Sequence, residues 1–480
     1  MRRALLALAL ASAITACTVV GPDYERPSVD TPTAWRVDYG QAAELANTRW
    51  WEQFDDPVLN ELIETALREN RDLRAAAARV DKFIGLLRST RAGFYPQVGY
   101  GVGASRNRAS EHGVPPLAPG TDPWYSLYQG SLGATWQIDL FGRIQRQTEA
   151  AQARVLASEQ GRRGVVLSVV TSVAASYIQL RSLDRQLEIA LATRKNFADT
   201  VDLFDLRFAG GVVSEVERSQ VRSQYDQARA AVPVFEAQIA AQENLLSILL
   251  GANPRAIPRG KSIDALAAPG IPGALPSSLL ERRPDVLQAE QNLVSANANV
   301  GVAKSLYYPT LSLTGVLGLA STALGDFLSS GAAVAALGVG LSGPIFTGGA
   351  IEGREFSAEA AQREALEFYQ LVILNALRET NNALVGTEKR RLEAEAQASR
   401  VRALREYSRL SRLRFDNGYA SYLEVLYAEN ELFSAELTAV NSNAQRFTEL
   451  VNVYKAIGGG WLDEADKLTP KAQGFVEKAK

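Results

Sequence analysis

The most constraining feature of this sequence is that its second half repeats its first. The segment "GFYPQVGYGVG", which contains Tyr95, returns as "LYYPTLSLTGV", which contains Tyr308. "LFDLRFAGGVVSEVE" returns as "LSRLRFDNGYASYLE", so that Phe208 matches Phe415 at a separation of 207 residues. An internal repeat indicates that each half forms the same structural unit. We therefore expect one order of elements in both halves: helix, strand hairpin, long helix, tight turn and second long helix.

Four segments of the chain alternate apolar and polar residues with the period of a β-strand. In "SLGATWQIDL" one face carries Leu132, Ala134, Trp136, Ile138 and Leu140, and the other carries small or polar residues. Its repeat "LGVGLSGPI" alternates in the same way, as do the segments around Tyr100 and Leu311. A soluble sandwich shows this pattern too, but it needs a second sheet to cover each apolar face. The pattern therefore favours strands that face lipid on one side and a polar lumen on the other.

Four strands cannot close a barrel, and an open sheet edge leaves backbone N–H and C=O groups unpaired. Because lipid offers no hydrogen-bond partner, such edges are not tolerated inside a membrane. The chain is therefore expected to oligomerise, so that strands of several copies complete one barrel.

The rest of each repeat indicates unusually long helices. No proline interrupts the helical pattern from about Gly142 to Phe208, and a helix of that length reaches roughly 100 Å. Apolar residues at steps of three and four, as between Val221 and Leu249, predict helices that pack side by side as in coiled coils. Pro233 interrupts this seam, and we expect a local bend there. A purely structural coiled-coil rod would not need the strand hairpins.

Two glycine-containing segments, "AGGVVS" and "DNGYAS", are typical of tight turns between long helices. Ser214 and Ser421 end these segments. Serine is a favoured N-cap because its hydroxyl accepts a hydrogen bond from the first helical turn. We expect both serines to cap the helices that follow them.

Composition excludes several kinds of chemistry. The formal net charge is −2, which gives no reason to expect nucleic acid as a partner. The single histidine, His112, lies in a loop rich in proline and glycine, so a histidine metal cluster or a Ser-His-Asp triad elsewhere is excluded. We therefore expect no enzyme activity, no cofactor and no metal. After the N-terminal leader no apolar run reaches about 18 residues, so a transmembrane helix is not expected either.

The single cysteine, Cys17, follows a short basic and apolar leader. Arg2 and Arg3 precede an apolar run from Ala4 to Ile14, which has the size of a secretory signal and is too short to span a bilayer. The sequence "ITAC", which ends at Cys17, resembles the bacterial lipobox, where cleavage just before a cysteine precedes its lipidation. We expect residues 1–16 to be removed and acyl chains on Cys17 to hold the protein on a membrane. An ordinary signal peptide with an incidental cysteine is the alternative.

With these parts placed, nearly the whole chain resembles the TolC/OprM-type outer-membrane efflux channels, and within them the NodT-like lipoprotein branch. The matching motifs are "CTVVGPDYERP", "WWEQFDDPVLNELI" at residues 50–63, and "ERRPDVLQAEQNL" at residues 281–293, which runs into "ANVGVAKSLYYPTLSLTG". Each motif is weak alone, but their order around an internal duplication is specific to this family.

The resemblance implies an α+β membrane protein that works as a homotrimer. Two β-hairpins per chain would contribute four strands to a twelve-stranded outer-membrane β-barrel, and the long helices would form a periplasmic α-barrel. The implied parts are a signal peptide (1–16), an anchor and equatorial segment (17–57), a first repeat (58–252), an equatorial linker (253–280), a second repeat (281–459) and an equatorial tail (460–480).

In the resembling family the channel is the passive exit duct of a tripartite pump. Its partners are an inner-membrane RND transporter and a periplasmic adaptor, or membrane fusion protein, and it passes drugs or other small toxic compounds outward. The implied location is the outer membrane, with a lipid anchor at Cys17 and an extension into the periplasm. A type I protein-secretion channel is the alternative within the family, and the lipobox and "GPDYERP" favour the multidrug branch. A structural lipoprotein and an enzyme are the other readings.

The two turns are the expected contacts with the adaptor. The residues concerned are Gly210, Gly211, Val212, Ser214, Asn417, Gly418, Tyr419 and Ser421. Their glycines also serve the simpler purpose of allowing left-handed backbone at a helix end.

A periplasmic gate is expected just past each turn, at Glu217, Leu423, Glu424 and Tyr427. Glu424 and Tyr427 are three residues apart, so they share a side of their helix. The family commonly has acidic residues at both positions, whereas here the second is tyrosine. We therefore expect a single acidic ring at Glu424 beside an aromatic constriction, with raised carboxyl pKa values and a preference for cations. The alternative is that an acidic residue in the first turn only favours the helix dipole.

Overall fold

The computed structural model describes residues 19–37, 47–113, 116–271 and 279–476. Cys17 and the expected signal peptide, residues 1–16, lie outside these ranges. The chain divides into two compact units, which are considered separately. Unit 1 comprises Met1–Pro27, Lys82–Ala157 and Glu290–Phe368, and unit 2 comprises Ser28–Asp81, Ser158–Ala289 and Tyr369–Lys480.

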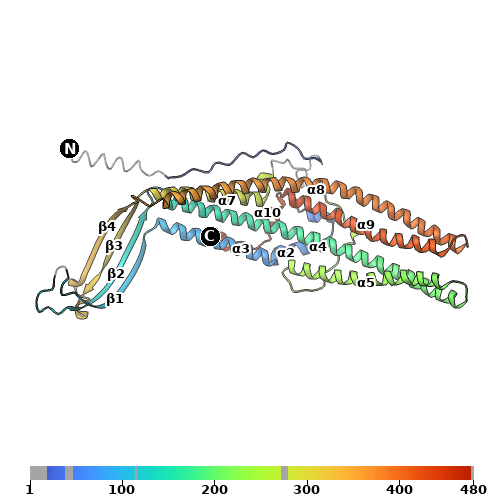
Figure 1. Ribbon diagram of the computed structural model, residues 1–480, viewed down its shortest axis with the longest axis horizontal. Helices are drawn as coiled ribbons and strands as arrows, with labels where there is room; N and C mark the ends of the chain where they lie inside the picture. The colour runs from blue at the N-terminus through green and yellow to red at the C-terminus, as the bar shows by residue number, and fades with distance from the viewer. Residues whose placement is uncertain (1–18, 38–46, 114–115, 272–278, 477–480) are drawn as a thin grey trace. The chain divides into compact units, whose positions relative to one another are not determined.

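The order of elements confirms the internal duplication (Figure 1). The first half contains α2 (Pro57–Glu69), α3 (Arg71–Arg91), β1 (Gln97–Arg108), β2 (Trp124–Ile138), α4 (Arg143–Ala209) and α5 (Glu215–Leu249). The second contains α6 (Leu279–Arg282), α7 (Pro284–Lys304), β3 (Thr310–Ser321), β4 (Ala333–Ser342), α8 (Ala350–Asp416) and α9 (Tyr422–Ile457), followed by α10 (Trp461–Asp466) and α11 (Gln473–Val476). The long helices α4 and α8 each have 67 residues.

The strands form one antiparallel sheet within unit 1, in the order β1-β2-β3-β4. Two sequence-based strand ends are wrong. The chain leaves the sheet after Ile138 rather than Leu140 because the Asp139 carboxylate accepts a hydrogen bond from the Gln145 N–H at 2.8 Å and starts α4. It leaves after Ser342 rather than Ile345 because Pro344 has no N–H to contribute to the ladder.

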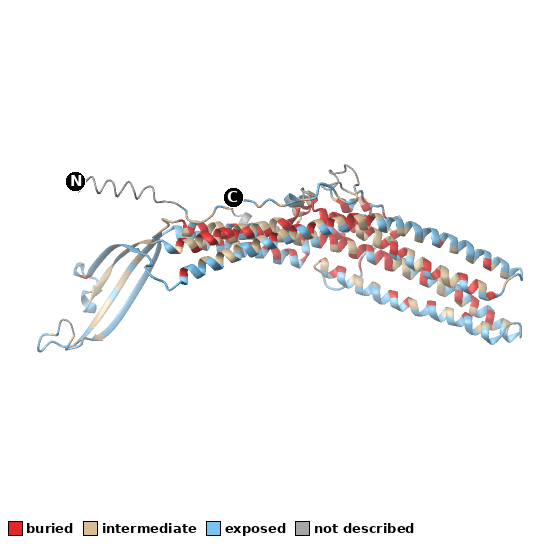
Figure 2. Cartoon of the chain, turned by 45° about the horizontal axis from the view of Figure 1, so that its top comes forward, coloured by how far each residue is buried: buried red, intermediate tan, exposed pale blue. Residues whose placement is uncertain are grey.

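The core of unit 2 is built on the apolar stripe of α4. Val166, Val170, Val173 and Tyr177 are buried there, together with side chains from α2, α5 and α9. Figure 2 shows buried residues concentrated in the helices and exposed residues along the strands. One stretch of α4 is long and apolar enough to cross a membrane, which qualifies the sequence-based exclusion, but 56% of it is buried inside the protein. That burial is typical of a core helix.

An aromatic cluster joins distant parts of the chain within unit 2. The Trp50 ring stacks on Tyr454 at 5.0 Å and meets Trp51 and Trp461 edge to face at 5.8 and 6.0 Å. All four residues are almost completely buried. The segment before α2, the end of α9 and the start of α10 therefore pack together.

The two long-helix hairpins α4–α5 and α8–α9 also meet in unit 2. Phe204 and Tyr422 lie 4.5 Å apart between ring centroids, and Val221 and Leu426 belong to the same buried cluster. α5 continues through Pro233 without a break. The expected bend at this proline stays a prediction.

Candidate functional site

The register of the sheet separates its side chains into two faces of opposite character. Because side chains alternate along a strand, residues paired across the ladder share a face. Tyr100 is opposite Leu132, which is opposite Leu317, and Val98 lies in the row that contains Leu337. The apolar face comprises Val98, Tyr100, Val102, Leu132, Ala134, Trp136, Ile138, Leu311, Leu313, Leu317, Leu319, Leu337, Val339 and Leu341. The alternation in the sequence thus produces one continuous apolar surface.

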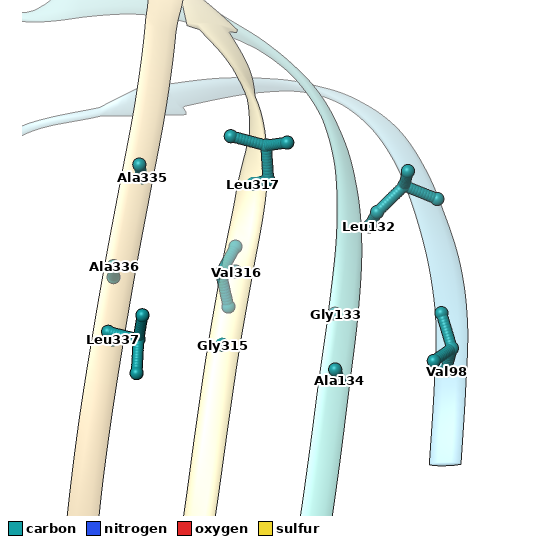
Figure 3. Close-up of a pocket in the computed structure, with 10 residues that line it drawn as sticks. All are labelled: Val98, Leu132, Gly133, Ala134, Gly315, Val316, Leu317, Ala335, Ala336 and Leu337. Atoms are coloured by element: carbon teal, nitrogen blue, oxygen red, sulfur yellow. The ribbon is translucent and has the colours of Figure 1, made fainter. Parts of the chain in front are cut away.

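This apolar face is open to the surroundings. Tyr100 is 85% exposed and Leu337 is 90% exposed. Figure 3 shows Val98, Leu132, Leu317 and Leu337 around a shallow hollow on the sheet. Such an area of exposed apolar side chains is rare on a soluble monomer and indicates an interaction surface.

The opposite face carries mainly glycine, serine and threonine. Its members include Gly99, Gly101, Gly103, Ser131, Gly133, Thr135, Thr310, Ser312, Thr314, Gly338, Gly340 and Ser342. Short side chains leave room next to the sheet, and their hydroxyl groups suit contact with water. This division is typical of a membrane barrel, with lipid outside and an aqueous lumen inside.

Both outer strands of the sheet have an unpaired edge. The sheet ends at β1 on one side and at β4 on the other, and neither strand has a further partner within the described chain. These edges can pair only with strands of another molecule.

A strap of residues 19–27 runs along unit 1 and is held by the buried Arg146. The guanidinium donates to the carbonyl oxygens of Val20 at 3.2 Å and Gly21 at 3.1 Å, and it also reaches Asp23 and Glu149, each at 2.8 Å. The side chain of Arg146 is only 5% exposed. Arginine can bind several acceptors at once because its donors are fixed in one plane. Two of the acceptors of Arg146 are backbone carbonyls of the strap.

Glycines let the strap lie directly on α7. Gly21 has φ +99°, and a Cβ there would come 2.3 Å from the Gly301 Cα. Asn297 donates to the Pro22 carbonyl at 3.0 Å, and Arg26 forms a salt bridge with Glu290 at 3.1 Å. No larger residue fits at Gly21 or Gly301 without moving the backbone.

The strap begins beside one end of the sheet. The Val20 N–H donates to the Phe141 carbonyl at 3.2 Å, three residues after β2 ends, and the Phe141 ring stacks on Tyr308 at 4.6 Å, just before β3. The Trp136 indole donates to the Phe94 carbonyl at 3.0 Å near the same end. Aromatic residues gathered at one end of an apolar band are typical of a membrane interface.

The two helical turns have the same backbone geometry. Gly211 has φ +72° and Gly418 has φ +78°, and an added Cβ would meet nothing within 4 Å at either position. The matched hydrogen bonds are Val212 N–H to Arg207 O and Gly211 N–H to Phe208 O in the first turn, and Tyr419 N–H to Arg414 O and Gly418 N–H to Phe415 O in the second. Glycine is needed at both places for its left-handed backbone rather than for space.

Comparisons with known proteins agree with this geometry. The family model described as "Outer membrane efflux protein" matches residues 62–252 and 275–459. The chain belongs to the outer membrane efflux protein family.

Similar members of this family are known by sequence and by structure. The probable efflux pump outer membrane protein TtgC of Pseudomonas putida is 31% identical, over 98% of this chain and 99% of its own length. The probable outer membrane lipoprotein SilC of Salmonella typhimurium is 29% identical, over 96% and 99%. The open-state structure of the MtrE outer membrane channel of Neisseria gonorrhoeae superposes with TM-score 0.84 and 27% identity, covering 95% of this chain and all of that one.

The structure of this outer membrane efflux protein places the expected adaptor contacts on two adjacent turns in unit 2. Val212 is 74% exposed and Tyr419 is 79% exposed. Between the hairpins, Arg207 lies over the Phe415 ring at 5.4 Å from its centroid. The two turns therefore form one continuous surface, on which the side chains of Val212 and Tyr419 are exposed.

Only one of the two expected serine caps forms. The Ser214 hydroxyl accepts from the Glu217 N–H, and the Glu217 carboxylate accepts from the Ser214 N–H at 2.8 Å, which completes a capping box. These bonds from Ser214 lower the pKa of Glu217. Ser421 holds the expected N-cap position, but its side chain makes no capping bond. The Glu424 N–H donates to the Ser421 carbonyl at 3.2 Å instead.

Three of the four expected gate residues, Leu423, Glu424 and Tyr427, lie close together on α9. Glu424 pairs with Arg414 at 2.7 Å and also receives a hydrogen bond from Ser411 at 3.4 Å. Leu423 and Tyr427 are 57% and 60% exposed. Glu217 lies on the other hairpin, where it serves as a cap. The chain itself thus provides Glu424 with a cationic partner, which the sequence pattern did not indicate.

Sequence reasoning missed the buried polar residues that connect remote segments. Arg146 is one example, and Asp56 is another. The Asp56 carboxylate is fully buried and accepts hydrogen bonds from the Tyr177 hydroxyl and the Lys261 N–H, both at 2.9 Å. Burial is the main cause that raises the pKa of the Tyr177 phenol. These partners are 121 and 205 residues from Asp56, so no local pattern could have revealed them.

Proposed function

We propose that this protein is the trimeric outer-membrane exit duct of a tripartite efflux pump, which passes small toxic compounds delivered by an inner-membrane transporter and a periplasmic adaptor. The duct is passive and binds no cofactor. The substrate is chosen by the transporter, because a lumen lined by glycine, serine and threonine offers little for selective recognition.

The observation that carries this proposal is the two-faced sheet with open edges. One face is apolar and exposed, the other is small and polar, and β1 and β4 both lack an outer partner. Lipid tolerates only closed strand systems. Three copies give twelve strands, and the side chains of about eight strands already fill a barrel interior, so twelve with small inward residues leave an open bore.

The N-terminal strap supports a lipid anchor at Cys17. Val19 and Val20 are the first described residues, and Val20 is bonded to Phe141 at the end of the sheet from which α4 departs. Acyl chains on Cys17, two residues earlier, would enter the membrane at this same end. Cys17→Ser should abolish acylation, detected by mass spectrometry of the mature N-terminus, with only partial loss of efflux because the barrel still inserts.

The exposed turns support contact with an adaptor and a gate at this end of the helices. Val212 and Tyr419 offer apolar contact, and Leu423 and Tyr427 lie one helical turn apart on α9. In the trimer, three copies of Tyr427 and of Glu424 would surround the axis of the tube. The Arg414 guanidinium would then reduce the negative charge that Glu424 contributes to this opening.

The proposed function is tested by two measurements on the same protein. Purified protein in planar bilayers should form channels, and expression in a host that lacks its own efflux ducts, together with the matching transporter and adaptor, should restore tolerance to dyes and solvents. A channel that exports a fused reporter protein but restores no tolerance would favour protein secretion instead. Absence of conductance would contradict both.

A further inference from the structure

The four strands contain only two charged residues, Arg106 and Arg108. Both are near the end of β1 and alternate with Asn107, so they continue the row of Tyr100 and Val102 on the apolar face. A charge on the lipid-facing side of a barrel is strongly unfavourable at the membrane midplane but tolerated at the interface. These two arginines therefore mark the level at which the apolar band ends.

The arginines lie at the end of the sheet opposite to the strap. β1 starts at Gln97, directly after the α3 segment, and ends at Arg108, which pairs with Trp124 at the start of β2. This end, which we call the outer rim, is the hairpin end of β1 and β2. Under the proposed function the helices lie in the periplasm, so the outer rim faces the outer leaflet.

The Arg106 side chain lies against Trp124 and has no acidic partner among the described residues. Its guanidinium lies 6.0 Å from the centre of the Trp124 ring, which confirms that the two side chains share a face. Among the described residues, no carboxylate is within ion-pair distance of Arg106. Arg108 is paired with Glu111 at 2.9 Å, and the Asp122 carboxylate accepts from the Trp124 N–H. The charge of Arg106 is therefore less neutralised by neighbouring carboxylates than that of Arg108.

The neighbouring loop adds apolar contacts at the outer rim. Between β3 and β4, Leu324 and Leu328 are 66% and 84% exposed, and the Phe327 ring lies over Gly130 on the apolar face. The adjacent charge in this loop is Asp326. A partner of this surface must offer acyl chains to the leucines and anionic groups to the arginines.

We propose that the outer rim binds the phosphate groups of a phosphorylated lipid in the outer leaflet, with Arg106 as the main contact, Arg108 as the second, and Trp124 holding Arg106 in place. The lipid would place its acyl chains along the apolar face. Guanidinium groups suit this role because they bind phosphate oxygens in a fixed, two-pronged geometry. This inference rests on the proposed outer-membrane location.

The test measures lipid binding to the intact trimer in detergent by native mass spectrometry. The probes are diphosphorylated lipid A, the same lipid after removal of its phosphates, and inorganic phosphate as competitor. The variants are Arg106→Gln, Arg108→Gln and the double substitution, with Arg229→Gln as a control because that exposed arginine is on α5 and pairs with Asp226.

We expect lipid A to bind the unchanged trimer, and its apparent Kd to rise about fivefold with Arg106→Gln, less with Arg108→Gln, and not at all with Arg229→Gln. Removal of the lipid phosphates should weaken binding to the unchanged trimer similarly, and inorganic phosphate should not compete. Equal binding of the dephosphorylated lipid, or unchanged binding by the double variant, would overturn the proposal. Competition by inorganic phosphate would also overturn it, in favour of a free-anion site. Channel conductance, measured on the same samples, reports on the proposed function separately.

Discussion

The Glu424 carboxylate forms a salt bridge with Arg414 at 2.7 Å. The matching residues of the first repeat, Glu217 and Arg207, bind other partners. There Glu217 caps α5 through Ser214, and Arg207 lies over the Phe415 ring. The same two residue types, 207 positions apart in the sequence, thus have different partners at the two turns. The second repeat keeps the pair that bears on the proposed gate.

Substitutions of this pair should change ion selectivity in opposite directions. Arg414→Gln leaves the Glu424 carboxylate without its cation, so the preference of the channel for cations should increase. Glu424→Gln should lower that preference and weaken block by multivalent cations. The measurement is the reversal potential in a salt gradient across a planar bilayer, with Arg229→Gln as control. Equal reversal potentials in all variants would remove Glu424 from the conduction path.

Tyr427 gives a related prediction for the size of the opening. Its side chain is exposed on α9 one turn after Leu423. If three such rings narrow the tube, Tyr427→Ala should raise the single-channel conductance without changing ion selectivity. A conductance equal to that of the unchanged protein would place the narrowest point elsewhere.

The two serines at the helix starts should differ in their contribution to stability. Ser214→Ala removes a capping box and should cost about 1 kcal/mol in the first turn of α5, whereas Ser421→Ala should cost almost nothing in α9. Hydrogen exchange of the first-turn amides measures both. Because its folded pKa is lowered, the ionised Glu217 stabilises the cap above the ordinary value of 4.5, and this contribution is lost as pH falls below it. Protection of the α5 start that survives at pH 3 would contradict this account.

Loss of Arg146 should release the strap without affecting lipidation. Arg146→Gln removes donors to the Val20 and Gly21 carbonyls and should weaken strap docking by about 1–3 kcal/mol. We expect faster proteolysis within residues 19–27 and fewer inserted trimers, while mass spectrometry still finds acylated Cys17. Arg91→Gln is the control, because Arg91 bonds an exposed glutamine on α4 and no strap residue. Equal protease resistance in both variants would show that the strap is held by other contacts.

The parts of the fold that follow from local patterns were predictable from the sequence. Period-two alternation placed Leu132 and Leu337 on the apolar face, and glycine chemistry identified the turns at Gly211 and Gly418. Strand ends were less accurate, because Asp139 and Pro344 stop the ladder through a side-chain bond and a missing N–H, which alternation does not register. The role of Glu424 was not predictable either, since it depends on Arg414, which lies on the preceding helix.

The claim that three sheets close into one lipid-facing barrel is tested most directly by joining the outer strands of neighbouring copies. Gly101 on β1 and Gly338 on β4 both belong to the small, polar face, and they are on opposite edges of the sheet. Within one chain β1 and β4 are three strand spacings apart, about 14 Å, which exceeds the reach of a disulfide.

Gly338→Cys is combined in turn with Gly99→Cys, Gly101→Cys and Gly103→Cys, so that three registers between β4 and the neighbouring β1 are sampled. The oxidised protein is then analysed on a denaturing gel. The account predicts that one of these pairs forms covalent dimers and trimers and nothing larger, while each single variant stays monomeric. Monomers from all three pairs, or a ladder that stops at dimers or continues beyond trimers, would contradict the twelve-stranded barrel.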